Sequence, residues 1–402
     1  MNFPVCVLRV LCGRMFFVRE SFLFPFSLLY RAVVSARRRF YERKIFRSYS
    51  LGARSISIGN ITVGGTGKTP LVAYIAEILA GEGEKVCVLT RGYGRENPRR
   101  RILVSDGRRI LTDNAKRAGD EPLELARKLI GAAVAVVADA DRVAAAGWAR
   151  ENLGATAFVL DDAFQHRRAR RDLDIVCIDA MNPFGNGKVL PAGILREPLS
   201  ALRRADAIVI TRANLVDEKK ISGLKSHLSN LSPEAKIFVS RNRITKLTPL
   251  EEFNGKPRRN EKAKEQESAI KNLESEISKN QKPETENRKP TDCRRPSADS
   301  YLAFCALGNP ENFFAQLRRE EFVLTAVKTF RDHHRYEQKD IEELESEAAR
   351  GAAEGFITTV KDAVKLRDLN FNRPCFVAES EIAFDDEKDF IEVIKNYELR
   401  MI

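Results

Sequence analysis

A glycine-rich loop of the phosphate-binding type stands between an apolar segment and a helix-like segment early in the chain. The run from Ser57 to Pro70 reads SIGNITVGGTGKTP; it continues the strand-like Ser55–Ile58 and opens the helix-like Leu71–Leu79. Glycines let backbone N–H groups turn toward phosphate oxygens, and a helix N-terminus adds partial positive charge at the same place. This strand–loop–helix order predicts a nucleotide site.

The loop ends in Gly67-Lys68-Thr69, residue types that bind nucleotide phosphates and magnesium. Lys68 would reach the β- and γ-phosphates, and the Thr69 hydroxyl would bind Mg²⁺. The strict pattern has glycine where Thr62 stands, and the alternative is a glycine-rich surface turn with a solvated lysine. The residues predicted to bind the nucleotide are Thr62, Val63, Gly64, Gly65, Thr66, Gly67, Lys68 and Thr69.

Two adjacent carboxylates, Asp161 and Asp162, end the apolar run Ala157–Leu160. An acidic residue at the tip of a buried strand beside a phosphate loop is the usual second contact of the magnesium ion. Mg²⁺ prefers hard oxygen ligands, some of them through water. Both residues are therefore predicted, with Thr69, to bind the metal; the alternative is a helix N-cap aspartate.

Other charged residues are less specific on their own. Arg142 and Arg196 could clamp phosphoryl oxygens, although Arg196 could also belong to a structural ion pair. His166 could contact the nucleotide or cap a turn. Asp120 begins a helix, where capping explains it as readily as catalysis. The histidines of Asp332–His334 could serve as a base or as the partner of a base, but a surface histidine is usually neither.

The positive charge of the chain lies mainly in its N-terminal arm. Residues 1–54 carry a net charge of +9 out of +12, and Phe22–Tyr30 is strongly apolar but far too short to span a bilayer. Aromatic and apolar residues followed by Arg37–Arg39 favour a segment at a membrane surface with anionic headgroups. The alternatives are a signal peptide and an amphipathic helix packed on the protein's own core.

Composition excludes some classes of protein. No basic surface interleaved with aromatics appears elsewhere, so nucleic acid is not an expected partner. The seven cysteines show no CxxC motif and no metal-ligand spacing, and several stand in apolar runs, which favours a reduced, cytoplasmic setting.

Apolar strand-like runs alternate with helical patterns after the loop, which predicts an α/β fold with a mostly parallel sheet flanked by helices. The expected strands are Lys85–Thr90, Ala133–Ala138, Thr156–Leu160, Asp174–Ile178 and Ala207–Thr211, and the expected helices are Glu121–Ile130, Ala140–Asn152 and Pro198–Arg204. Further strands are expected at Tyr301–Leu307, Phe322–Thr329, Phe356–Val360 and Cys375–Ala378.

The chain is therefore divided into four parts. Residues 1–50 are expected to form the membrane-associated arm, and residues 51–250 a P-loop core. Residues 251–300 are a polar insertion that cannot bury enough apolar surface to fold and is expected to be disordered. Residues 301–402 form a smaller second α/β domain.

Taken together, the motifs resemble the tetraacyldisaccharide 4′-kinase family of Gram-negative envelope synthesis. The matching segments are Gly59–Pro70, Leu89–Arg95, Gly119–Pro122, Asp161–Ala180, Phe184–Arg212, Gly308–Phe314, Asp332–His334 and Thr358–Leu366. Two features depart from the family pattern: Ala163 stands where glycine usually follows the aspartate pair, and the charged insertion before Ser300 is atypical.

The resemblance implies ATP- and Mg²⁺-dependent phosphorylation of the 4′-hydroxyl of tetraacyldisaccharide 1-phosphate, giving lipid IVA. It implies that Asp120 pairs with a histidine, assigned to His333 with His334 kept as the alternative, to accept the proton of the acceptor. It also implies a peripheral enzyme at the cytoplasmic face of the inner membrane.

Two other functions fit part of the pattern. A membrane-docked switch NTPase would use the loop, the two aspartates and the arm, but it leaves the Asp332–His334 motif unexplained and lacks a clear guanine-reading motif. A soluble small-molecule kinase or ligase would have no need of the arm.

Overall fold

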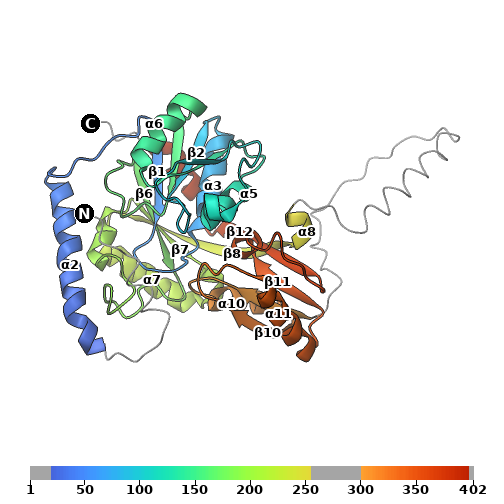
Figure 1. The fold of residues 1–402 in the computed structure, drawn as a ribbon. Coiled ribbons are helices and arrows are strands. Elements are labelled where there is room, and N and C mark those ends of the chain that lie inside the picture. The colour runs from blue at the N-terminus through green and yellow to red at the C-terminus, as the bar shows by residue number, and fades with distance from the viewer. Residues whose placement is uncertain (1–19, 255–299, 398–402) are drawn as a thin grey trace, which may run out of the picture.

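The structure, a computed structural model, describes residues 20–254 and 300–397, and these form one twelve-stranded sheet flanked by helices (Figure 1). Most of the predicted insertion, residues 255–299, lies outside the described residues. The spatial order is β10-β9-β11-β12-β8-β7-β6-β1-β5-β2-β4-β3. The strands are β1 (Arg54–Gly59), β2 (Val86–Thr90), β3 (Ile102–Ser105), β4 (Ala135–Ala138), β5 (Ala157–Asp161), β6 (Leu173–Asp179), β7 (Ala207–Thr211), β8 (Lys236–Pro249), β9 (Tyr301–Cys305), β10 (Leu324–Thr329), β11 (Gly355–Thr359) and β12 (Cys375–Phe384).

Helices cover the sheet, as the alternating pattern predicts, and α2 lies along one side of the molecule (Figure 1). They are α2 (Glu20–Glu42), α3 (Lys68–Gly81), α4 (Ala115–Ala118), α5 (Asp120–Lys128), α6 (Arg142–Leu153), α7 (Glu218–Leu231), α8 (Leu250–Phe253), α10 (Glu311–Arg319), α11 (Gln338–Arg350), α12 (Val360–Ala363) and α13 (Glu387–Asn396), with 3₁₀ turns η1 (Leu199–Arg204) and η2 (Ala213–Leu215). The segment expected as a helix over Pro198–Arg204 is thus a 3₁₀ turn.

Strand β8 joins the two halves of the sheet. Its first residues run parallel to β7, with Lys236 opposite Ala207, and its remaining residues run antiparallel to β12, with Ser240 opposite Phe384. Apart from this pair and β3 with β4, all pairings are parallel. The carboxyl ends of parallel strands open at one edge of the sheet, where ligands bind in such folds.

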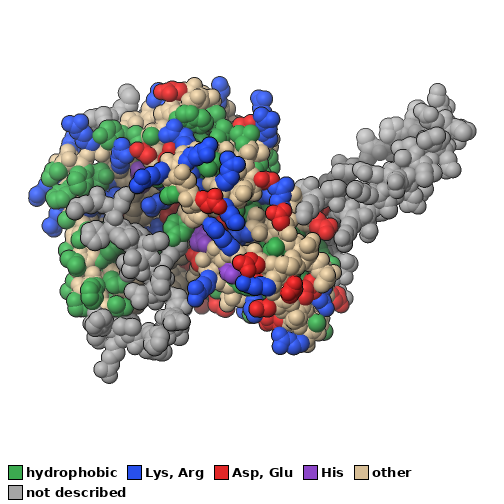
Figure 2. Space-filling model, in the orientation of Figure 1, with side chains coloured by type: hydrophobic (Ala, Val, Ile, Leu, Met, Phe, Trp, Pro, Cys, Tyr) green, Lys and Arg blue, Asp and Glu red, His purple; other side chains and the backbone are tan. Residues whose placement is uncertain are grey.

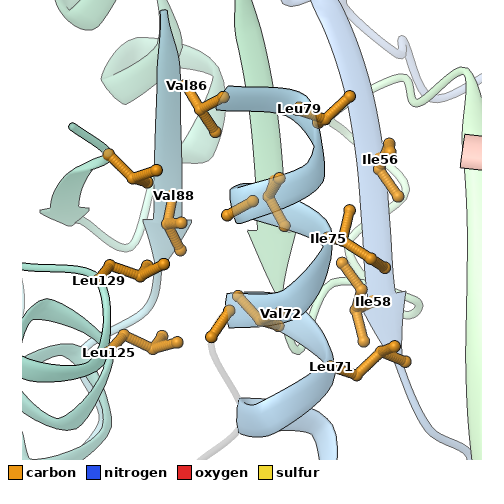
Figure 3. Close-up of a cluster of buried hydrophobic side chains, with 14 of the residues drawn as sticks. Ile56, Ile58, Leu71, Val72, Ile75, Leu79, Val86, Val88, Leu125 and Leu129 are labelled. Carbon is orange, nitrogen blue, oxygen red and sulfur yellow. The ribbon is translucent and has the colours of Figure 1, made fainter. Parts of the chain in front are cut away.

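The core of the first half forms between β1 and α3. Leu71, Val72, Ile75 and Leu79 recur at helical spacing on α3 and are fully buried against β1 residues such as Ile58 (Figure 3). Each such side chain contributes roughly 1.5–3 kcal/mol on burial. This packing fixes α3, and with it the phosphate loop at its N-terminus.

The C-terminal helix α13 packs back onto the first half. Phe390 of α13 is fully buried and stacks on Phe384 of β12, with ring centroids 4.1 Å apart, and on Phe238 of β8 edge to face. The two halves therefore share apolar contacts as well as strand pairing. The cysteines within the described residues, Cys87, Cys177, Cys305 and Cys375, are buried and unpaired, as predicted for small hydrophobes.

Helix α2 is held by polar contacts to the loop before η1. The Ser27 hydroxyl donates to the carbonyl of Val189 and accepts from the backbone N–H of Ala192, both at 2.9 Å. The Tyr30 hydroxyl donates to the carbonyl of Arg196 at 3.0 Å. Within residues 20–254 and 300–397, no helix combines the length and the apolarity needed to cross a bilayer.

Candidate active site

The phosphate loop takes the shape that its glycines allow. Gly64 and Gly67 have φ of 104° and 76°, values that side-chain-bearing residues adopt with strain. Side chains hold the loop from below: the Thr211 hydroxyl donates to the Thr66 carbonyl at 2.9 Å, and the Asn60 amide donates to the Thr66 hydroxyl at 3.0 Å. The backbone at the loop is therefore fixed, and Lys68 is the first residue of α3.

A second segment, Ile194–Arg196, pairs with the backbone at the start of the loop. Thr62 forms an antiparallel bridge with Leu195, and the backbone N–H of Val63 donates to the carbonyl of Ile194 at 2.8 Å. The N–H of Arg196 donates to the carbonyl of Ile61 at 2.7 Å. This pairing brings Arg196, which is distant in the sequence, next to the loop. The loop and the Arg196 guanidinium could then bind the same anion.

Asp162 lies between two cations. Arg196 Nη1 donates to both its carboxylate oxygens at 2.9 Å, and Lys68 Nζ is 3.4 Å from Oδ1. Burial raises the pKa of Asp162, but Lys68 and Arg196 outweigh burial and hold it well below its usual range. The left-handed residue of this turn is Asp162, with φ of 49°. Ala163 does not have a positive φ, so its position does not require glycine. The departure at Ala163 thus leaves the presentation of Asp162 intact.

Asp161 is a buried carboxylate; burial outweighs the effect of Lys68 and Arg142, which lower its pKa. The Thr90 hydroxyl donates to its Oδ2 at 3.2 Å. Burial, with the negative charges of Glu121 and Asp162, raises the pKa of Asp161 to about 7. A divalent cation would relieve this excess negative charge. No group of three or more His, Cys, Asp or Glu side chains among the described residues is arranged to hold a metal.

Asp120 and His333 come together from opposite halves of the sheet. Asp120 is the first residue of α5, and His333 lies in the turn between β10 and α11. His333 Nδ1 is 3.1 Å from Asp120 Oδ2, and both side chains are about 15% exposed. His333 adopts a left-handed backbone with φ of 60°, a strained conformation for a residue with a side chain, which the surrounding structure must enforce.

The neighbouring histidine turns away from this pair. His334 Nε2 lies 2.9 Å from Asp340 Oδ2, and its ring stacks on Phe330 with centroids 4.8 Å apart. The structure therefore places His333, and not His334, against Asp120.

The Asp120–His333 pair lies next to the phosphate loop. A Cβ on Gly308, after β9, would be 3.4 Å from the Gly64 Cα and 3.2 Å from Asp332 Oδ2, so both the loop and the residue before His333 meet there. Hydrogen bonds from Arg212 help to fix this approach: its Nη1 donates to the Gly65 carbonyl at 2.8 Å and to Asp179 at 2.7 Å. Asp179 also accepts from Asn312 of α10 at 2.8 Å.

Arg142 and His166 lie behind the two aspartates. Arg142 is buried and donates over 3.3–3.4 Å to the carbonyls of Asp139, Ala140 and Asp161, and burial lowers its pKa to about 10. Burial, with Arg142 and other arginines nearby, lowers the pKa of His166 to about 3, so this ring is neutral. His166 Nδ1 and Arg142 Nε are buried, and neither has a hydrogen-bond partner among the described residues.

Several residues around the pair carry no role in the sequence predictions. Lys361 lies 3.1 Å from Asp332, Lys365 lies 3.9 Å from Asp120, and the Tyr93 ring is 5.2 Å from the His333 ring. Lys361, Lys365 and Tyr93 all lie in segments that carry the family resemblance, and that membership is the one sequence feature that could have pointed to them. Burial lowers the pKa of Lys361, but Asp332 and Glu121 outweigh it and raise the pKa above its ordinary value.

Comparison with known proteins identifies the family. A family model described as LpxK, tetraacyldisaccharide-1-P 4′-kinase, matches residues 19–398. The chain belongs to the LpxK family. The tetraacyldisaccharide 4′-kinase of Halothermothrix orenii is 36% identical over 93% of this chain and 92% of its own length, and that of Desulfotalea psychrophila is 34% identical over 92% and 94%.

A solved LpxK has the same fold. The crystal structure of LpxK from Aquifex aeolicus is 26% identical, covers 94% of this chain and 99% of that chain, and aligns with a TM-score of 0.66. Family and relatives confirm the predicted enzyme class, a 4′-kinase of lipid A biosynthesis, and do not favour the switch NTPase. They confirm the α/β fold with a large, mostly parallel sheet.

Proposed function

We propose that this LpxK protein transfers the γ-phosphoryl group of ATP to the 4′-hydroxyl of tetraacyldisaccharide 1-phosphate, with Asp120 as the proton acceptor. The observation that carries the proposal is the Asp120–His333 contact of 3.1 Å, formed beside the phosphate loop by residues 213 positions apart. The LpxK of Aquifex aeolicus was solved in complex with ATP, which supports the choice of nucleotide.

The nucleotide would lie on the loop from Thr62 to Thr69, with Lys68 at its phosphates. Mg²⁺ would be held by Thr69, Asp161 and Asp162; the high pKa of buried Asp161 and the hydroxyl and carboxylate oxygens fit this ion. When bound, Mg²⁺ neutralises charge on the phosphates. Arg196, whose guanidinium donates to Asp162, would supply a further fixed cation beside the transferred group.

The acceptor hydroxyl would meet Asp120. As the 4′-oxygen bonds to the γ-phosphorus and the bond from phosphorus to the bridging oxygen breaks, Asp120 accepts the hydroxyl proton. His333 holds the other carboxylate oxygen in place. Phosphoryl transfer depends mainly on positioning and charge neutralisation, and a positioned base typically contributes 10²–10⁴-fold. The fixed backbone at both the loop and the pair supplies the positioning.

A membrane-bound acceptor also explains α2. Phe24, Phe26, Leu29 and Val33 of α2 are exposed, Leu29 by 65%, and apolar side chains gather along the side of the molecule where α2 lies (Figure 2). A pocket of about 470 Å³ between α2 and Pro198 is lined by Arg31, Arg38 and Arg39 among others. Apolar residues next to arginines suit a helix that lies in the interface of an anionic membrane, here the cytoplasmic face of the inner membrane.

The test uses purified protein, labelled ATP, Mg²⁺ and tetraacyldisaccharide 1-phosphate in detergent micelles, with Lys68→Ala as the blank. A Lys68-dependent bis-phosphorylated lipid on thin-layer chromatography is the expected result. ATP hydrolysis without that lipid would overturn the proposal.

A further inference from the structure

Lys361 contacts the side of His333 that faces away from Asp120. It lies in α12, directly after β11, and its Nζ is 3.1 Å from Asp332 Oδ1 and 3.5 Å from His333 Nε2. Its side chain is 13% exposed. No part of the proposed transfer uses this lysine, although it touches one of the two groups proposed to handle the proton.

The contact with Lys361 affects which of the two imidazole nitrogens of His333 carries the proton. The Asp332 and Glu121 charges keep Lys361 protonated, so it has N–H groups to donate and no lone pair to accept. Nε2, facing an ammonium group, is stable as a lone pair and not as an N–H. Asp332 Oδ1 lies 3.7 Å from Nε2, too far for a hydrogen bond that would hold a proton there. Nδ1 then carries the proton and donates it to Asp120.

Other charges around His333 act in opposite directions. Asp120 and Asp332 are carboxylates on either side of the ring, and both favour the doubly protonated imidazolium. Lys361 opposes this directly and offsets the charge of Asp332, while Lys365 Nζ lies 3.9 Å from Asp120 Oδ2, the oxygen that His333 also contacts. The Tyr93 ring lies 5.2 Å from the imidazole at an interplanar angle of 45°, and it adds no formal charge while its phenol is neutral.

We propose that Lys361 is a positioning residue that holds His333 in its neutral Nδ1–H tautomer. An imidazolium would hold the Asp120 carboxylate in an ion pair and make it a weaker base. A neutral Nδ1–H donor orients Asp120 and leaves its second oxygen to accept a proton. The catalytic consequence rests on the proposed function; the tautomer does not.

The direct test is ¹⁵N NMR of the intact protein labelled at histidine, because the chain has only four histidines. Spectra of His333→Asn identify the His333 signals, and Asn is chosen because it tolerates a left-handed backbone. Wild type is expected to show one protonated nitrogen at His333, Nδ1. In Lys361→Met, His333 is expected to become doubly protonated or to move its proton to Nε2, while Lys361→Arg keeps the wild-type pattern.

Three results would overturn the proposal: a wild-type His333 with its proton on Nε2, a wild-type His333 protonated on both nitrogens, or an unchanged Nδ1–H signal in folded Lys361→Met. The double variant Asp332→Asn/Lys361→Met removes both charges and is expected to return His333 to a neutral ring. If Lys361→Met does not fold, the wild-type tautomer and Lys361→Arg still decide the question.

Kinetics separate positioning from a merely structural role. Lys361→Met is expected to lower kcat by about tenfold or more, with the KM for ATP unchanged and the acid limb of the pH–kcat profile moved to higher pH. A loss confined to thermal stability, with an unchanged pH profile, would overturn the catalytic part. If Asp120→Asn keeps full transfer while the NMR shows Nδ1–H, the proposed base fails and the tautomer assignment stands.

Discussion

Replacing Asp120 by Asn tests whether this residue is a base or the polar start of a helix. The amide has the shape of the carboxylate and can still accept from His333 Nδ1, now 3.1 Å away. It cannot take a proton from a hydroxyl. Two effects on stability are expected from the structure: Asp120 is an acidic residue in the first turn of α5, and its Oδ2 is 3.9 Å from Lys365 Nζ.

A capping role and a catalytic role for Asp120 predict effects on different quantities. Loss of a cap lowers the free energy of unfolding, whereas loss of a base lowers kcat. Loss of the carboxylate at a helix N-terminus costs about 0.3–1 kcal/mol, and exchanging a charge-assisted for a neutral hydrogen bond costs about 1 kcal/mol more. Together, about 1–2 kcal/mol of unfolding free energy would be lost, with no change in kcat. Loss of a general base lowers kcat by roughly 10²–10⁴, a barrier increase of about 3–5 kcal/mol.

The assay measures initial rates of labelled phosphate transfer at saturating ATP and lipid, with the thermal midpoint and nucleotide affinity of the same preparations. Asp389→Asn is a matched control, since Asp389 is also acidic and in the first turn of a helix, α13. We expect Asp120→Asn to lose at least a hundredfold in kcat while it binds nucleotide and stays folded. A kcat within about threefold of the Asp389→Asn control would refute the reasoning, because loss of a general base cannot leave the transfer rate so nearly unchanged.

Three further predictions follow from α2 and α5. Leu29→Ser with Val33→Ser, both exposed on α2, should weaken binding to anionic vesicles about tenfold or more in a flotation assay; unchanged flotation would contradict membrane docking. Tyr30→Phe removes the donor to the Arg196 carbonyl and should lower kcat/KM about fivefold, whereas equal kinetics would mean that α2 does not support Arg196. Burial raises the pKa of Glu124 to about 7 from 4.5, so its contribution to stability is present below pH 4.5 and is lost as the pH rises to 7, by on the order of 3 kcal/mol. Glu124→Gln should therefore be the more stable protein at pH 8 and equal to wild type at pH 4 in urea unfolding; parallel curves would contradict the shift.

Strands buried on both faces could be predicted from the sequence, because each is a short apolar run. Strands β1, β2 and β5 are examples, and all their residues are buried except Arg54 at the start of β1. Strand β8 was missed: Lys236–Pro249 contains four Lys or Arg and only some of its residues are buried. Its two ends pair with different partners, parallel with β7 and antiparallel with β12. Only Ile237–Val239, opposite β7, form a short apolar run, and the longer part opposite β12 is interrupted by charged residues. Strand β3, at the edge of the sheet, was missed for a different reason: its apolar run, Ile102–Val104, is very short.

The candidate site was predictable to different depths. Lys68 and Asp162 follow neighbouring strands of one sheet, so their approach to 3.4 Å follows from strand ends meeting at one edge. The pairing of Asp120 with His333 came from the family resemblance, since a first-turn aspartate and a surface histidine predict nothing alone. The choice between His333 and His334 depends on a left-handed residue in the turn, which sequence patterns do not reveal. The contact of Lys361 depends on the register of β11 and was not expected.

The seam between the two halves determines whether the proposed chemistry can occur. Asp120 belongs to a helix of the first half and His333 to a turn of the second, so their 3.1 Å contact depends on how the halves are joined. They are joined by the β8–β12 pairing and by Phe390 of α13, which lies against β8 and β12 in a fully buried position. Close-packed interiors transmit small shifts, and a displacement of about 1 Å at reacting groups can cost a hundredfold in rate. The residues of the seam, although outside the phosphate loop, therefore help to set the geometry that the proposed transfer requires.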